Sequence, residues 1–193
     1  MRKPRYAKQL TDLPKPYHTA AMAEVAQQTD RGAAIVGAAY LDLVLRHAIT
    51  ARLCDLPDVM PLLFEDRGPL QNFSARIQVA FALGIYGHRA YADLGIIRHI
   101  RNAFAHSAEA MDFNNSYLAE RCKELWFPKV RYGKRPMPST ARESFIRAIE
   151  LLSDGLHENV GRQKDGMPPS AFLMSGPRPP GKSTRKVKPP LTG

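Results

Sequence analysis

The chain has 193 residues, of which 44% are hydrophobic and 24% charged, a composition typical of one soluble globular domain rather than of a disordered or fibrous chain. Only two cysteines occur, Cys54 and Cys122, far apart in the sequence, which excludes a disulfide framework and a zinc ribbon. The net charge of +10 comes from the two ends, because basic and acidic residues balance between positions 17 and 160, and this distribution argues against a folded face that reads duplex DNA.

The N-terminal segment, residues 1–16, holds five basic residues and one acidic residue, interspersed with prolines. We expect it to be disordered, because such a sequence buries little apolar surface. No apolar stretch follows the basic start, so we expect no export signal and a cytoplasmic protein. The most apolar segment, residues 33–45, is too short to cross a bilayer and contains Asp42, so we expect no membrane contact.

Helical periodicity begins after residue 16. We predict a short helix over residues 19–28 and a long helix over residues 31–53, whose apolar side chains form one stripe. Asp30 is the predicted N-cap of the long helix, and Pro57 lies just beyond its end.

The middle of the chain predicts a loop and then two helices. Residues 61–69 contain one glycine and two prolines and are predicted to form the loop. Ser74 can cap a helix that runs to about Leu83, where glycines follow. A second long helix is predicted over residues 88–106, because apolar side chains recur along one of its faces.

Two more helices are predicted before the C-terminal tail. The first covers residues 114–125 and uses Asn114 as its cap. The second covers residues 139–156, where Thr140 and Glu143 match a capping box. We find no stretch with the alternating pattern of a β-strand.

Long amphipathic helices joined by short loops predict an all-α fold, an antiparallel helical bundle over residues 17–160. The tail, residues 161–193, is rich in Pro, Gly, Ser and Lys and holds seven basic residues and one acidic residue. We expect it to be disordered. Such a tail can act as a solubilising segment, or it can contact RNA, DNA or an acidic partner without sequence specificity.

Arg101 and His106 lie five residues apart near the end of the second long helix. An arginine fork can clamp a phosphate, and a histidine exchanges a proton near neutral pH. Together they could support phosphodiester cleavage without a metal, with His106 taking the proton of the attacking hydroxyl and Arg101 stabilising the charge on the phosphate oxygens. The same residues also fit a structural role, as an arginine paired with an acid and a histidine that closes the helix end.

Asp42 is the acid expected to accompany this pair. It falls on the apolar stripe of the first long helix, so it should face inward and need a partner. Arg101, Arg98 and Arg46 are the candidates, and we favour Arg101. The ion pair could fix the helix register, or it could hold the guanidinium in position for a phosphate.

Metal and cofactor chemistry is not indicated by the sequence. His99 and His106 are two helical turns apart, which is too far to share one metal ion without ligands from another element. The sequence contains no phosphate-binding loop, dinucleotide fingerprint or nucleophile elbow. We therefore expect no metal and no cofactor.

Three groups of residues carry a family resemblance. They are Arg31-Gly32-Ala33-Ala34-Ile35-Val36-Gly37-Ala38-Ala39-Tyr40-Leu41-Asp42; Gly68-Pro69-Leu70 with Phe73-Ser74-Ala75-Arg76-Ile77 and Ala82-Leu83-Gly84-Ile85; and Tyr91-Ala92-Asp93-Leu94 with Ile97-Arg98 and Ile100-Arg101-Asn102-Ala103-Phe104-Ala105-His106. In this order and spacing they resemble the mannitol-repressor (MtlR-like) family over residues 30–125. The resemblance implies an all-helical protein linked to negative regulation of transcription, best known for a sugar-alcohol uptake operon. It implies no recognised DNA-reading motif, and the absence of net charge between positions 17 and 160 agrees with an indirect mode through partner proteins.

The run from Arg101 to His106 is also similar to the signature of HEPN (higher eukaryotes and prokaryotes nucleotide-binding) domains. Many of these domains are metal-independent ribonucleases that act as dimers. That resemblance implies that Arg101 and His106 are catalytic, that Asn102 orients them and that Asp42 supports Arg101.

Two functional hypotheses follow. The first is a regulatory, repressor-like protein that acts through protein contacts, and the alternative is a HEPN-type endoribonuclease of the toxin or defence kind. In both cases we expect a homodimer through the faces that carry Arg101 and His106. A nuclease needs these two side chains accessible across a basic cleft, whereas a regulator can bury them.

Overall fold

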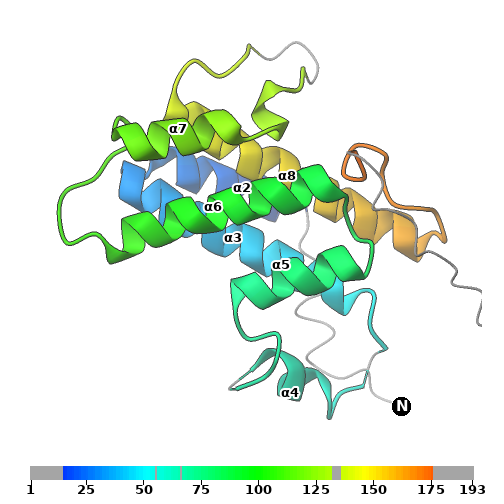
Figure 1. Ribbon diagram of the computed structural model, residues 1–193. Helices are drawn as coiled ribbons and strands as arrows, with labels where there is room; N and C mark the ends of the chain where they lie inside the picture. The colour runs from blue at the N-terminus through cyan, green and yellow to red at the C-terminus, as the bar shows by residue number, and fades with distance from the viewer. Residues whose placement is uncertain (1–14, 55, 66, 132–135, 176–193) are drawn as a thin grey trace, which may run out of the picture.

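A computed structural model describes residues 15–54, 56–65, 67–131 and 136–175 (Figure 1). Within these ranges the chain is all-helical and has no β-strand, which confirms the predicted fold class. The helices are α2 (Lys15–Gln27), α3 (Asp30–Thr50), α4 (Met60–Phe64), α5 (Phe73–Ala82), α6 (His88–His106), α7 (Ser116–Glu124), the short 3-10 helix η1 (Phe127–Lys129) and α8 (Ala141–Lys164). The disorder expected of residues 1–14 and 176–193 falls outside the described residues.

Helix α3 is the centre of the bundle. Helices α2, α5, α6 and α8 all pack against it, and α6 runs across its face in Figure 1. Small residues such as Ala34 and Ala38 let these neighbours approach closely, while Leu41 and Leu45 fill the space between them. Among the described helices, α3 alone is long and apolar enough to cross a membrane by length and composition, and it is the core helix, with 61% of that segment buried.

The N-caps of three helices differ from the predicted residues by one or two positions. Thr29, not Asp30, caps α3, since its hydroxyl accepts the N–H of Gly32. Asp30 instead makes tertiary contacts, accepting a hydrogen bond from the N–H of Phe113 at 2.8 Å and from Arg142 at 2.6 Å. The other two caps are Asn72 for α5, in place of Ser74, and Asn115 for α7, in place of Asn114. The chemistry of capping is as predicted, but the choice between neighbouring cap residues depends on contacts with other helices.

The predicted loop over residues 61–69 contains the short helix α4, at the bottom of Figure 1. Pro61 is compatible with this helix because it occupies the first turn, where its missing N–H costs nothing. The buried ring of Phe64 fixes α4 to the rest of the bundle.

The capping box of α8 is confirmed, with Thr140 and Glu143 exchanging their two hydrogen bonds. The helix then continues to Lys164, beyond the bundle boundary expected at residue 160. After it, the chain turns back onto the bundle and buries Leu173 completely. Asn159 anchors this return, because its side-chain amide donates to the carbonyl of Ile85 and accepts the N–H of Ser170. Apolar residues inside a proline-rich segment therefore extend the packed structure to about residue 173.

Candidate functional site

Arg101, Asn102 and His106 occupy the last two turns of α6. Five residues correspond to a rotation of about 140° around a helix axis, so Arg101 and His106 point in different directions. Arg101 lies on the side of buried Ile97 and is partly buried, whereas His106 is exposed at the helix end. The Arg101 Nη1 atom donates to the side-chain oxygen of Asn102 at 3.0 Å. Within one chain, the helix therefore does not bring Arg101 and His106 to a common groove.

Asp42 faces inward, as predicted, but its partner is not Arg101. Its Oδ2 atom accepts a hydrogen bond from Arg76 Nη1 at 2.6 Å, and Arg76 was not among the candidates. The favoured pairing with Arg101 is therefore wrong, because α5 packs against α3 and brings its own arginine to the carboxylate. Arg76 is buried and also donates to the carbonyls of Leu70 and Gln71, so three acceptors hold its guanidinium.

The charges of two further guanidinium groups act on the same carboxylate. Burial raises the pKa of Asp42, and its hydrogen bond with Arg76 and the charges of Arg76, Arg101 and Arg46 oppose that rise. Arg46 is one turn after Asp42 on α3, and its guanidinium lies 4.9 Å from the centre of the Phe64 ring. We call Asp42, Arg46, Arg76 and Arg101 the arginine cluster. It joins α3, α5 and α6.

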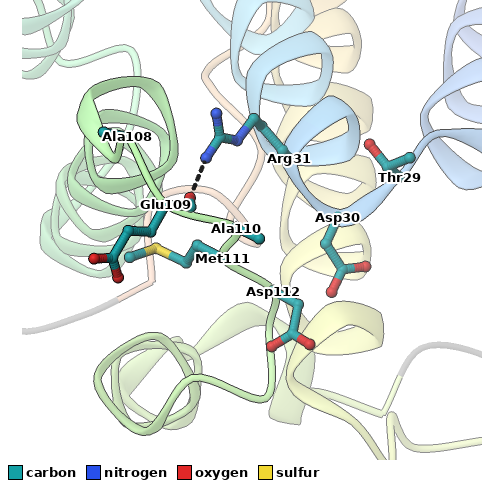
Figure 2. A pocket seen from close by; sticks show the side chains of 8 residues that line it. All are labelled: Thr29, Asp30, Arg31, Ala108, Glu109, Ala110, Met111 and Asp112. Atoms are coloured by element: carbon teal, nitrogen blue, oxygen red, sulfur yellow. Dashed lines mark hydrogen bonds between the residues drawn. The ribbon is translucent and has the colours of Figure 1, made fainter.

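The loop after His106 is held by Arg31 at the start of α3. Its Nη2 atom donates to the carbonyl oxygens of Ser107 at 3.1 Å and Glu109 at 2.7 Å, the second of which is drawn in Figure 2. A hollow of about 470 Å³ opens beside this loop, and Asp30, Arg31, Glu109 and Asp112 contribute its charged side chains. Three carboxylates against one arginine make this hollow unfavourable for a phosphate.

A second polar network joins α2, α3 and α8. His18 Nε2 lies 2.9 Å from Asp154 Oδ1, and His18 Nδ1 lies 2.8 Å from the hydroxyl of Tyr40. The same hydroxyl lies 3.1 Å from His157 Nε2. Burial raises the pKa of Tyr40. Burial, together with the nearby His18 and His47, lowers the pKa of His157 to about 4. This network fixes α2 to the bundle through side chains of α3 and α8.

Two polar residues with buried contacts, Arg76 and Asp93, were not predicted from the sequence. Arg76 occupies the same face of α5 as Phe73, Ile77 and Ala80, so its inward direction was readable from the helical period. Asp93 is buried and accepts the backbone N–H groups of Trp126 and Phe127 at 2.9 to 3.0 Å. Burial raises its pKa, and these hydrogen bonds oppose that rise. In the sequence, an acidic residue within the apolar face of α6 indicated that its carboxylate would face inward and accept hydrogen bonds from another segment.

No group of three or more metal-binding side chains occurs in the part of the chain that the structure describes. Cys54 is exposed and Cys122 is buried, and both are free thiols. Among the described residues, the groups available for binding or proton transfer are therefore arginine, histidine and carboxylate side chains.

Comparison with known proteins gives one match. The family described as mannitol repressor matches residues 58–156, which run from the segment before α4 through most of α8. No curated protein and no solved structure matches the chain significantly. The matched segment covers just over half of the chain and includes α5, Asp93 and the Arg101–His106 run, so the chain belongs to the mannitol repressor family.

Proposed function

We propose that this protein is a negative regulator of transcription that acts through contacts with other proteins. The observation that supports the proposal most directly is the mannitol repressor match over residues 58–156. The charge distribution supports an indirect mode, because basic and acidic residues balance between positions 17 and 160. Without a surplus of positive charge, this part of the chain gains little from binding DNA phosphates.

The geometry of α6 also favours a regulator over a nuclease. Arg101 is partly buried and its charge acts on Asp42, whereas His106 is exposed, and the two side chains point in different directions around the helix. In the proposal, the protein is a cytoplasmic homodimer, and the exposed side of α6 is available to a second copy or to a partner protein.

Expression measurements together with DNA-binding measurements test the proposal. Deleting the gene should raise transcription from at least one operon, and expressing the full chain should restore repression. The purified full chain should not bind the affected promoter more tightly than an unrelated duplex at the same salt concentration. Unchanged transcripts after deletion would refute the repressor role. Specific promoter binding by the purified chain alone would refute the indirect mode.

A HEPN-type endoribonuclease is the second candidate. Its support is the hydrogen bond between Arg101 and Asn102, together with the exposure of His106. These contacts match the orienting role of Asn102 that the resemblance implies, and a dimer could supply the missing half of the cleft.

RNA cleavage by the purified protein in EDTA tests this candidate. Wild type is compared with His106→Ala and Arg101→Ala, and His99→Ala serves as the control because His99 is an exposed histidine on the same helix. Cleavage that disappears in the first two variants and persists in the control would support the nuclease. A folded wild-type dimer that cleaves none of a varied set of RNAs would exclude it.

A further inference from the structure

The arginine cluster contains two buried polar atoms without a hydrogen-bond partner among the described residues. They are Asp42 Oδ1 and Arg46 Nε, one turn apart on α3. Buried polar atoms in folded proteins are almost always paired, so an unpaired acceptor and an unpaired donor at one place call for an explanation. Packing alone does not explain these two unpaired atoms, because an apolar residue would fill the same space at a lower cost in folding free energy.

The charges of the cluster are also unbalanced. The charges of three guanidinium groups act on one carboxylate, which leaves an excess of two positive charges when Asp42 is ionised. Arg76 is the arginine that Asp42 pairs with. The guanidinium of Arg46 lies over the Phe64 ring, and Arg101 donates to the amide oxygen of Asn102. Neither of these two guanidinium groups is neutralised by an ion pair in the described structure.

Arg46 and Arg101 are partly exposed, whereas Arg76 is buried and held by three acceptors. The cluster thus consists of one ion pair, Arg76 with Asp42, and two partly exposed arginines, one from α3 and one from α6.

We propose that the arginine cluster binds a small phosphate-bearing anion. The phosphate oxygens accept hydrogen bonds from Arg46 and Arg101, after the side chain of Arg46 turns toward the ligand. A hydroxyl of the ligand, such as the P–OH of hydrogen phosphate, donates to Asp42 Oδ1 and satisfies the unpaired acceptor. Inorganic phosphate carries a charge between about −1 and −2 at neutral pH, which offsets the excess charge of the cluster, and both of these forms keep a P–OH donor.

The unpaired carboxylate oxygen predicts a preference between two similar anions. Inorganic phosphate carries a hydroxyl donor at neutral pH, whereas sulfate has the same shape and no donor. A site with a buried acceptor rejects the ligand that cannot pair with it. We therefore expect the full-length wild-type chain to bind phosphate at least about tenfold more tightly than sulfate, measured by calorimetry at low ionic strength.

Two variants with opposite expected effects test the site. Arg46→Gln should weaken phosphate binding by about tenfold, since it removes one charged donor. Asp42→Asn should strengthen sulfate binding and reduce the preference for phosphate, because it removes the repelling charge. Arg121→Gln is the control, since Arg121 lies on α7 in an ion pair with Glu124 and should leave both affinities unchanged.

Thermal unfolding and circular dichroism confirm that each variant is folded before binding is measured. The proposal is refuted if wild type shows no saturable phosphate binding at millimolar concentrations, or if Arg46→Gln binds phosphate as wild type does. It is also refuted if single-stranded RNA binds with the same dependence on Arg46 while inorganic phosphate does not bind. These outcomes are independent of the proposed repressor role, because the assay needs no partner, and of the nuclease motif, because Arg46 lies outside it.

Discussion

His157 should make the stability of this protein fall as the pH decreases from about 6.5 to about 4. The pKa of His157 is lowered from an ordinary value of 6.5 to about 4 in the folded protein. The unfolded chain therefore takes up a proton that the folded chain does not, and protonation favours unfolding. Stability from this group is fully present above pH 6.5 and is lost as the pH falls toward 4.

The size of the effect follows from the pKa difference. A shift of this size corresponds to about 3 kcal/mol at roughly 1.4 kcal/mol for each pH unit. Because the ring is only partly buried, solvent screening reduces the expected loss to about 2 kcal/mol.

Urea unfolding of wild type and His157→Gln between pH 7 and pH 4 measures this loss. Glutamine can still donate to the hydroxyl of Tyr40 but does not titrate. The free energy of unfolding of wild type should fall by about 2 kcal/mol more than that of the variant across this range. Asp42 and Asp93, whose folded-state pKa values are raised by burial, contribute with the opposite sign and cancel in the difference. Two parallel curves would refute the reasoning.

Three further substitutions test separate contacts by chemical unfolding and amide exchange. Asp93→Ala leaves two buried N–H groups without their acceptor and should cost about 3 kcal/mol, more than Asp93→Asn, which retains one acceptor oxygen. Gly87→Ala places a Cβ 2.6 Å from the carbonyl oxygen of Met174, so it should speed amide exchange in residues 170–175 before it affects the rest of the bundle. Arg142→Met removes three hydrogen bonds that hold the corner between α2 and α3 and should cost about 2 kcal/mol, clearly more than Arg121→Met, which removes only a solvent-screened surface ion pair.

Each of these has a result that would contradict it. Equal costs for Asp93→Ala and Asp93→Asn would mean that the carboxylate charge, not its accepting oxygens, holds the N–H groups. Uniform exchange in Gly87→Ala would mean that residues 170–175 unfold only with the whole bundle. Equal losses for the two arginine variants would mean that the contacts of Arg142 are no stronger than a surface ion pair.

The long helices were predictable because their apolar residues repeat with the period of a helix and because Thr140 and Glu143 mark a helix start without reference to any other part of the chain. The partner of Asp42 was not predictable in the same way. The sequence showed that Asp42 faces inward, but Arg76 reaches it only because α5 crosses α3 at that level. A choice among four arginines depends on how helices pack, which local patterns do not encode.

For the Arg101–His106 run too, the sequence identified the residues but not how the packing of helices directs their side chains. The residues and their spacing were readable, and so was the possibility of phosphate chemistry. The direction of each side chain depends on which face of α6 meets α3, and this places Arg101 with the arginine cluster and His106 at the surface. A shared cleft would need a second chain, which sequence patterns on one helix cannot position.

Helix α3 lies outside the segment that matches the mannitol repressor family, yet it supplies the centre of the fold. The matched segment, residues 58–156, contributes Arg76 and Arg101 to the arginine cluster, while α3 contributes Asp42 and Arg46. Asp42 fixes Arg76, and Arg46 brings the additional charge, so the matched arginines join these two side chains only when α5 and α6 pack against α3. A phosphate ligand at the cluster would therefore tie together three helices. Its binding would stabilise the packing of α6 against α3 and α5, and under the proposed function this would link an anion site to a regulator that works through protein contacts.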